Sequence, residues 1–316
     1  MRALTLLEAA KLAGAPALTT QIIEIMAKTA PLLAEFPFKT VVGGANIFTR
    51  EDTLPSTAFR AVNGSYTASE GQMERVVDEV KIAGGDLDVD VAIVKTRGQL
   101  VRAAHEAMKA KKLAENIQLA LLKGDPATTP NEFAGLQALL TSGQPLAGTQ
   151  LIANGATSGG DPLSIKKLHD LIDAVYGATH LIMNRSMRTW LTMAASNTGV
   201  GGYITRTVNE FGQVVEKFRE RKILVVETMD GQDSVLPFSE ANPGGGSSVG
   251  TSIYAANIGD GGWVGIQGGP LEVRDLGELQ TAPVYRTRVE WLCAHSVEHK
   301  RGVGRLWGIT NAAPTV

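Results

Sequence analysis

The sequence has 316 residues, of which 44% are hydrophobic and 20% charged, proportions that are ordinary for a folded soluble protein. A formal net charge of −2 excludes an overall positive field for binding nucleic acid through its phosphates. The single cysteine, Cys293, excludes an internal disulfide framework, and no apolar run reaches the ~20 residues of a membrane span. Glu8, Lys11 and Glu24 interrupt the apolar N-terminal stretch, so we expect no signal peptide and a cytoplasmic site of synthesis.

The N-terminal segment, residues 1–37, is predicted to form a helical arm. Two helices are expected, over residues 3–13 and 19–35, and Pro37 is expected to end the second. Their apolar faces have few hydrophobic partners in the neighbouring sequence. We therefore expect the arm to pack on a distant surface and to be buried only on assembly.

Residues 38–78 are predicted to form an extended hairpin. Strand-like runs recur at 38–42, 47–50 and 57–62, and Asn63-Gly64 is a common hairpin turn signal. A two-stranded ribbon of this kind is only marginally stable alone in water, so we expect it to lie on a neighbouring copy of the chain. The residues expected at that subunit interface are Phe48, Arg50, Glu51, Asp52 and Arg60.

One long amphipathic helix, over residues 97–123, is the dominant element of the sequence. Thr96 is its candidate N-cap, a turn is predicted before it at residues 83–86, and Gly124 is its expected end. At ~1.5 Å per residue, a helix of this length spans roughly 38 Å. The residues expected to form its packing stripe are Leu100, Ala104, Met108, Leu113, Ile117 and Leu121.

The C-terminal half combines short helices and strands with one long strand. Residues 281–298 alternate apolar and polar side chains, and at ~3.3 Å per residue a strand of this length matches the long helix that we expect it to back. Residues 145–275 are predicted to form an α/β subdomain. Its helices are expected at 164–175 and 186–195, and its strands at 180–183, 222–227, 253–258 and 263–266.

Two patterns resemble known ligand sites but lack essential parts. Asp86, Asp88 and Asp90 resemble the start of a calcium loop, yet the glycine and the distal glutamate are missing. Acidity at a helix entry is the better interpretation. The glycine-rich segment at residues 244–250 has no following lysine to hold a phosphate, so a surface loop is the better interpretation there.

The remaining candidates for chemistry also have structural interpretations. Cys293, His295 and His299 alternate along the long strand, where packing explains them better than zinc binding or nucleophilic catalysis. No catalytic, cofactor or metal site is predicted, and the chain is not expected to be an enzyme. Subunit ion pairs or solvation explain the following arginines at least as well as nucleic-acid contact: Arg185, Arg188, Arg206, Arg219 and Arg221.

The order of these parts resembles the major capsid proteins of tailed phages that have the HK97-type fold. The sharpest local match is the helix end at Leu122-Lys123-Gly124-Asp125, followed by Gly135-Leu136, which is similar to that family's L-x-G-D … G-L pattern. The strand-to-helix step at 180–186 and the strand at 223–227 resemble the family's axial domain. The helix-end residues to which the resemblance gives a role are Gly124, Asp125 and Gly135.

The resemblance implies an α+β fold with four parts. These are an N-terminal arm (1–37), an E-loop hairpin (38–78), a P domain (79–144 and 276–316) with a spine helix (97–123), and an α/β A domain (145–275). The chain departs from the family's founding member, in which a lysine of the E-loop is covalently linked to a neighbouring subunit. Lys39, the one lysine near the hairpin, lies at its base and not at its tip, so no covalent cross-linking is predicted.

The resemblance further implies that the chain forms pentamers and hexamers of itself. These would build the icosahedral or prolate head shell around packaged double-stranded DNA, enclosed without specific contacts and without a membrane. The shell would be assembled in the host cytoplasm and reside in the virion. A separate scaffolding protein is an expected partner, since the chain starts almost directly at the arm. A portal is also expected, with a decoration protein as an optional partner.

Two alternatives remain open at this point. One is a shell protein of an encapsulin-type bacterial nanocompartment, which has the same fold and houses a cargo enzyme. The more distant one is a soluble α/β enzyme that uses the glycine-rich segment or Cys293 with His295.

Overall fold

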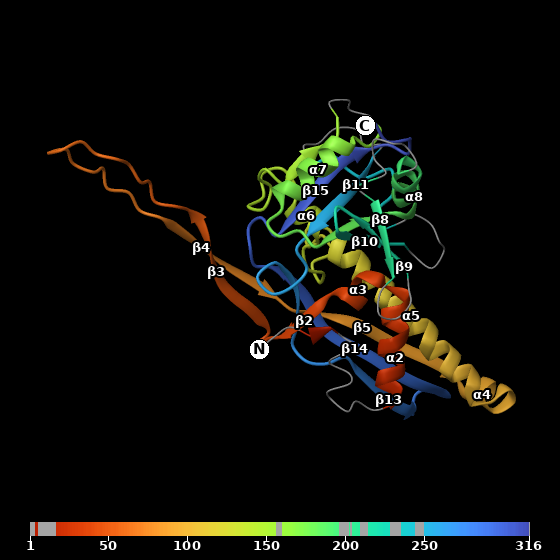
Figure 1. Cartoon of the computed structure of the whole chain (residues 1–316). Coiled ribbons are helices and arrows are strands. Elements are labelled where there is room, and N and C mark those ends of the chain that lie inside the picture. The colour runs from red at the N-terminus through yellow and green to blue at the C-terminus, as the bar shows by residue number, and fades with distance from the viewer. Residues whose placement is uncertain are drawn as a thin grey trace.

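A computed structural model describes residues 4–5, 17–155, 160–195, 202, 204–208, 214–227, 235–243 and 250–315. Two β-sheets with their helices form the body, and a long hairpin projects away from it (Figure 1). This mixture of separate sheets and helices is the α+β class expected from the sequence. In the described part of the chain, no helix is both long and apolar enough to cross a membrane.

The first sheet has six strands and is organised by the longest strand, β14. One edge of β14 pairs with β5 along residues 284–293, and its other edge pairs with β13 and then with β12. β2 extends the sheet parallel to β12, and β1 pairs with β2. The strands are β1 (Leu4–Thr5), β2 (Pro37–Thr40), β5 (Lys81–Asp90), β12 (Trp263–Gln267), β13 (Glu272–Glu278) and β14 (Val284–Val297).

The second sheet has seven strands and is covered on both faces. On one face α7 (Ile165–Ala174) and α8 (Arg185–Ala194) pack against Leu181 and Met183, while Ile182 faces a core shared with the first sheet. Alternate residues of one strand therefore serve two different cores. In order across the sheet the strands are β6 (Leu151–Ala153), β15 (Val303–Ile309), β11 (Thr251–Ala256), β7 (His180–Met183), β10 (Arg221–Val225), β9 (Val214–Phe218) and β8 (Ile204–Val208).

The long helix is interrupted near its expected start. α4 (Val91–Arg97) ends at Gly98, whose φ of 82° is the left-handed region that favours glycine, and α5 (Gln99–Lys123) begins after it. The N-cap of α4 is Asp90, which accepts a hydrogen bond from the amide of Ala92 at 2.7 Å. The prediction of Thr96 as cap of one continuous helix is therefore wrong.

The second half of α5 has the predicted packing stripe, and the first half does not. Leu113, Ile117 and Leu121 are buried in the main core, whereas Leu100, Ala104 and Met108 are exposed in the subunit. The first half is held on the sheet by polar contacts instead. These join Arg102 and Glu106 to Thr287 of β14 and Arg102 to Asp275 of β13. Glu106 and Glu115 of this helix are buried as well.

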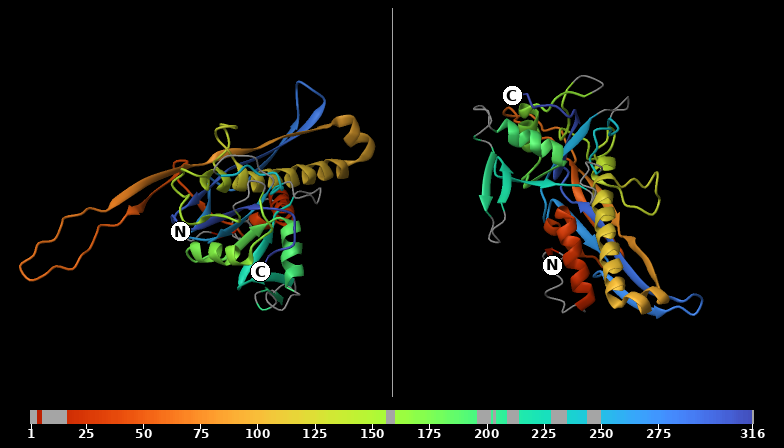
Figure 2. Two further views of the ribbon diagram at one scale, coloured as in Figure 1. Left: turned by 90° about the horizontal axis from the view of Figure 1, so that it is seen from above. Right: turned by 90° about the vertical axis from the view of Figure 1, so that its right-hand side faces the viewer.

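The N-terminal helices are part of the subunit's own core, which corrects the prediction that they are buried only on assembly. α2 (Ala17–Thr29) lies along α5, and α3 (Pro31–Glu35) follows after a break at Pro31 (Figure 2). Their side chains Ile22, Met26 and Phe36 are buried in the main core. Glu35 also forms an ion pair with Lys222 of β10. The segment thus joins the spine helix to the second sheet.

The predicted helix over residues 3–13 is wrong where it can be compared. Residues 4–5 form β1, and residues 6–13 lie outside the described part of the chain. The helices and strands that were predicted for the α/β region lie within two residues of their expected bounds. The sequence analysis did not predict the hairpin β8–β9 or the strands β6 and β15.

The projecting hairpin has other bounds than predicted. It consists of β3 (Ala45–Thr53) and β4 (Gln72–Glu79), paired from Ala45–Glu79 to Thr53–Gln72. Residues 54–71 are an unpaired tip, so the strand expected at 57–62 is absent from it. The predicted strand at 38–42 instead forms β2 of the first sheet, because Phe38 packs there against Phe36 and Trp291.

Three further expectations are corrected by strand pairing. The turn expected at 83–86 lies within β5, where a Cβ on Gly84 would come within 2.2 Å of the Val289 carbonyl oxygen, so close pairing with β14 explains the glycine. β12, expected in the α/β subdomain, belongs to the first sheet. Residues 303–309, which were assigned to the P domain, form β15 of the second sheet.

The two halves of α5 give a matched test of burial. Ile117 is 3% exposed, so Ile117→Asn should lower the free energy of unfolding by about 3 kcal/mol through the lost apolar contacts and a buried amide. Leu100 is 83% exposed, so Leu100→Asn should change the free energy of unfolding by no more than about 0.5 kcal/mol. Urea unfolding of the unassembled subunit measures both. Equal losses would contradict the burial described here.

Candidate functional site: the projecting hairpin and the loop behind the spine helix

The tip of the hairpin presents apolar side chains to solvent. Phe59 has a relative exposure of 108%, and Leu54, Val62 and Tyr66 are also largely exposed. Several large apolar side chains exposed on one short segment of a soluble protein indicate an interaction site. The tip therefore has the composition of a surface that is covered in the functional state.

The tip has a defined local structure. The guanidinium of Arg60 lies over the ring of Tyr66, 5.4 Å from its centroid, and donates hydrogen bonds to the carbonyl oxygens of Ala61 and Gly64. Asn63 occupies the left-handed region with φ of 66°, as asparagine in turns commonly does. A tip that is ordered before contact loses less conformational entropy when it binds.

Polar contacts fasten the base of the hairpin to the end of β14. Asn46 donates a hydrogen bond to the Ser296 hydroxyl at 3.2 Å, and Asp78 also contacts Ser296. Burial raises the pKa of Asp78 above its ordinary value, while the Ser296 hydrogen bond opposes this shift. Asp52 forms an ion pair with Lys300 at 2.7 Å. The hairpin therefore leaves the body in a set direction.

The structure places the predicted interface residues in different environments. Arg50 pairs with Glu74 across the hairpin at 2.8 Å, and Asp52 pairs with the body, so both are engaged within the subunit. Phe48 is half-buried and Glu51 is exposed. Sequence reasoning missed the apolar tip residues. The available signal was the occurrence of Leu54, Phe59, Val62 and Tyr66 in a segment too polar to build a core.

The loop behind the spine helix is closed by two glycines that the structure brings together. The amide of Gly135 donates to the carbonyl oxygen of Gly124 at 2.7 Å. A Cβ on Gly135 would lie 2.6 Å from both Ala120 O and Gly124 N. Gly124 has φ of −51° and ψ of 131°, which is not left-handed backbone. A Cβ there would lie 2.3 Å from the Phe133 carbonyl oxygen, so close approach explains this glycine. Asp125 accepts from the Ala127 amide and the Thr128 hydroxyl, which shapes the loop.

His295 connects this loop to the first sheet. Its Nδ1 accepts a hydrogen bond from Trp263 Nε1 at 3.0 Å, which leaves Nε2 to donate to the carbonyl oxygen of Ala134 at 2.7 Å. Burial lowers the pKa of His295 to about 4, so the ring is neutral at pH 7. Burial likewise raises the pKa of Cys293 to about 12, which makes its thiol unreactive.

The sequence patterns considered for metals or nucleotides have structural roles or fall elsewhere. His299 stacks on Tyr176 beyond the end of β14, away from Cys293 and His295. Within the described ranges, no group of three or more His, Cys, Asp or Glu residues is placed to hold a metal ion. Residues 244–249 of the glycine-rich segment lie outside the described residues.

The three aspartates interpreted as helix-entry acidity divide into two roles. Asp86 and Asp88 pair with Arg288 and Arg286 across β5 and β14, at 2.7 Å and 2.6 Å, and these contacts lower the pKa of both carboxyls. Asp90 alone caps a helix. Because the Asp86–Arg288 and Asp88–Arg286 ion pairs are exposed, they contribute little to the stability of the fold, and their role is to align β5 with β14.

The arginines considered for nucleic-acid contact are largely engaged within the subunit. Arg185 pairs with Glu227, Arg206 with Glu216, and Arg219 with Asp173. Arg221 donates to the carbonyl oxygens of Ala178 and Arg219.

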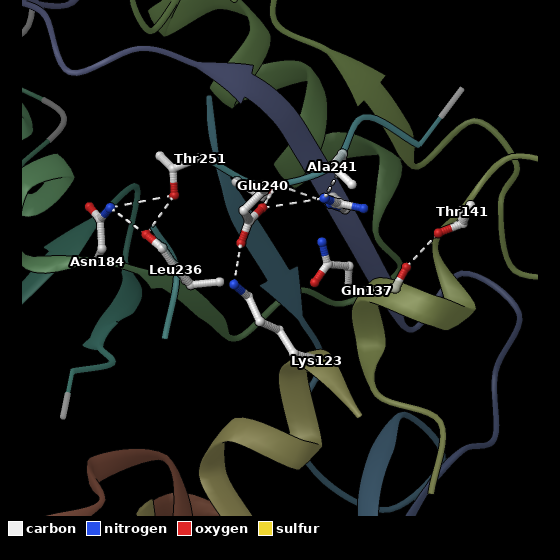
Figure 3. A network of polar contacts seen from close by, with 10 residues as sticks. Lys123, Gln137, Thr141, Asn184, Leu236, Glu240, Ala241 and Thr251 are labelled. Carbon is white, nitrogen blue, oxygen red and sulfur yellow. Dashed lines mark hydrogen bonds and ion pairs between the residues drawn. The ribbon is translucent and has the colours of Figure 1, made fainter. Parts of the chain in front are cut away.

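A buried ionic cluster joins the end of the spine helix to the second sheet (Figure 3). Lys123 points toward Glu240 from the last turn of α5, with 3.6 Å between Nζ and Oε1. Arg305 of β15 approaches the same carboxylate at 3.3 Å, and the Ser252 hydroxyl donates to it at 2.5 Å. Removing one member of such a cluster would leave a buried charge uncompensated. The cluster therefore holds the spine helix and the second sheet in one orientation.

Comparison with known proteins supports a shared architecture. Residues 15–168 match the family model of the major capsid protein GP7. The holo-SrpI encapsulin complex from Synechococcus elongatus PCC 7942 has a TM-score of 0.59 at 17% identity, covering 98% of this chain and 96% of that chain. The capsid of an empty GTA particle has a TM-score of 0.59 at 13% identity, covering 89% of this chain and 90% of that chain. A structure from Microbacterium phage Oxtober96 has a TM-score of 0.58 at 12% identity, covering 90% of this chain and 91% of that chain. No curated protein matches the sequence significantly.

The closed loop gives a test on glycine. Gly135→Ala should lower the free energy of unfolding by at least about 1–3 kcal/mol, because the new methyl group meets backbone atoms that cannot move independently. Gly269→Ala is the matched control, since a Cβ there meets nothing within 4 Å. Thermal or urea unfolding of both variants measures the difference. A neutral Gly135→Ala would show that the loop is not closed in this way.

The neutral state of His295 predicts a pH dependence. Below pH 6.5 the unfolded chain binds a proton at this residue, but the folded chain does not until about pH 4. The free energy of unfolding should therefore fall as the pH drops through this window, by on the order of 3 kcal/mol from this group. His295→Gln keeps an acceptor and a donor but does not titrate. The His295→Gln variant should lose less free energy of unfolding between pH 6.5 and pH 4 than the wild type. An identical pH dependence of the free energy of unfolding in the two proteins would contradict the neutral state of His295 in the fold.

Proposed function

We infer that this chain, which has the HK97-type capsid fold, is the major capsid protein of a tailed phage and builds the head shell from many copies of itself. The subunits form pentamers and hexamers, which close into an icosahedral or prolate shell. The work of the chain is mechanical, since the shell encloses double-stranded DNA and resists its pressure.

The projecting hairpin is the observation that carries this proposal. The body buries its apolar residues in two cores, whereas the hairpin tip leaves Phe59, Val62 and Tyr66 in solvent. Exposed apolar side chains gathered on a folded segment indicate a surface that another molecule covers. Repetition of such contacts over many copies produces a closed shell.

The proposal extends to the place and partners of assembly. Assembly takes place in the host cytoplasm, with a separate scaffolding protein and a portal as partners and a decoration protein as an optional one. The packaged DNA is enclosed without sequence-specific contacts. This is consistent with the net charge of −2 and with arginines that are engaged within the subunit.

An encapsulin-type nanocompartment is the second candidate, because the encapsulin complex matches over 98% of this chain. The two functions differ in what the shell contains. Purified shells treated with nuclease should protect double-stranded DNA if the chain is a phage capsid protein. Shells that hold a cargo protein and no protected DNA would favour the nanocompartment.

Shortening the hairpin tests the assembly role directly. Because Thr53 and Gln72 are paired, residues 54–71 can be replaced by Asn-Gly, which closes a two-residue hairpin turn. The shortened subunit should keep its melting temperature within about 2 °C, because the tip buries no core residue, and it should form no shells. Light scattering and electron microscopy measure assembly. A shortened chain that unfolds, or that still assembles normally, would contradict the role of the tip.

A further inference from the structure

Positive charge is concentrated on the two helices α4 and α5. Residues 91–123 contain seven basic and two acidic side chains and so carry a net charge of +5, although the formal net charge of the whole chain is −2. The remaining residues therefore carry −7. A local excess of this size creates a positive field over one part of the surface, even though the protein as a whole is acidic.

Part of this charge is not neutralised within the subunit. The two glutamates are buried, and each forms an ion pair with a basic residue of the same helix. Among the residues that the structure describes, no ion pair is formed by four bases: Lys95, Arg97, Lys109 and Lys111. The first two end α4, where the helix dipole accounts for basic residues, but the other two lie in the middle of α5, where it does not.

The unpaired bases lie along an exposed edge of the body, the spine ridge, which we define as residues 91–112. Arg102 and Glu106 hold the first half of α5 on the first sheet, so the opposite side of the helix faces solvent. Lys112 is 66% exposed on this side. α4 continues the ridge to the far end of the body (Figures 1 and 2). At ~1.5 Å per residue, Lys95 and Lys112 are separated by roughly 25 Å.

An extended row of unpaired positive charges fits a polyanion of regular spacing. Duplex DNA carries one phosphate per ~1.7 Å of its axis, so the spine ridge would meet several phosphates wherever the duplex lies along it. Contacts between basic side chains and phosphates carry no sequence information. Such contacts are therefore compatible with DNA that is enclosed without sequence-specific recognition.

An acidic amphipathic helix of another protein is the competing partner, because apolar side chains are also exposed on the spine ridge. Leu100 is 83% exposed, but Ile93 and Met108 are about half covered, at 42% and 56% exposure. Single exposed apolar residues are normal on soluble proteins. The unpaired charge extends along the whole ridge, so it favours the phosphate backbone over the apolar face of a helix.

We propose that the spine ridge faces the inside of the shell and binds the phosphates of packaged duplex DNA through its four unpaired bases. The contact is electrostatic and independent of sequence. The inference rests on the proposed function, and it adds a DNA-binding surface and, with it, the side of the subunit that faces inward.

Binding of a fluorescein-labelled 30-base-pair duplex to the unassembled subunit tests the charge requirement. The ridge variant combines Lys95→Gln, Arg97→Gln, Lys109→Gln and Lys111→Gln. Fluorescence anisotropy at 50 mM salt should show binding weakened by about tenfold or more. The slope of log K against log salt concentration should become shallower by about 3, at ~0.9 per phosphate contact.

A matched control removes the same charge from exposed bases on α7, α8, β8 and β13. It combines Lys166→Gln, Arg185→Gln, Arg206→Gln and Arg274→Gln, all of which form ion pairs in the subunit. The control should bind the duplex within about threefold of the wild type, and both variants should keep the wild-type melting temperature. A wild-type subunit that does not bind, or a control that loses as much affinity as the ridge variant, would overturn the inference.

Lysine acetylation with sulfo-NHS-acetate tests the same contact in assembled shells. Mass spectrometry should find Lys95, Lys109 and Lys111 at least about fivefold less reactive in DNA-filled shells than in empty ones, and Lys166 unchanged. Equal reactivity in the two kinds of shell would overturn the inference. Protection that requires an internal protein and disappears when DNA replaces it would assign the ridge to a protein partner instead. These outcomes leave the proposed function intact, whereas a chain that forms no shells, or none that hold DNA, would overturn both.

Discussion

The burial of the second half of α5 between the two sheets is the constraint on which the rest of the subunit depends. Leu113, Ile117 and Leu121 share one core with Trp291 of β14 and Tyr254 of the second sheet. Because protein cores are close-packed, this contact determines both the position of the helix and the distance between the sheets. The N-terminal helices, the ionic cluster at Glu240 and the closed loop after Gly124 all attach to the same helix.

The body buries most of its large apolar side chains, whereas the hairpin exposes several of them. In the body, β7 supplies Leu181 and Ile182 to two different cores, so this strand is buried on both faces of the second sheet. In the hairpin, the two strands pair with each other but leave apolar side chains in solvent. A rigid body with an uncovered extension is suited to assembly, since the extension gains burial only when a neighbour is present.

Buried polar groups set orientation in this subunit more than they add stability. Neutral His295 joins Trp263 to the carbonyl of Ala134, and Glu240 receives both Lys123 and Arg305. A buried ionic or polar contact of this kind repays its desolvation only in one geometry. These contacts therefore hold the loop and the spine helix at defined places beside the base of the hairpin.

The sequence alone determined the elements whose signals are local. Four features could be recognised in the sequence: the period of the long helix, the alternation of β14, the glycines at the helix end and the order of the parts. Together they indicated the HK97-type fold. Tertiary structure decided the rest, because burial depends on what covers a face. Leu100 and Met108 have the period of a core stripe, yet neither α2 nor the sheet covers them, while Ile22 and Phe36 lie in a core that the local sequence did not reveal. Gly84 likewise resembles a turn residue in the sequence, and only the approach of another backbone explains Gly84 and Gly135.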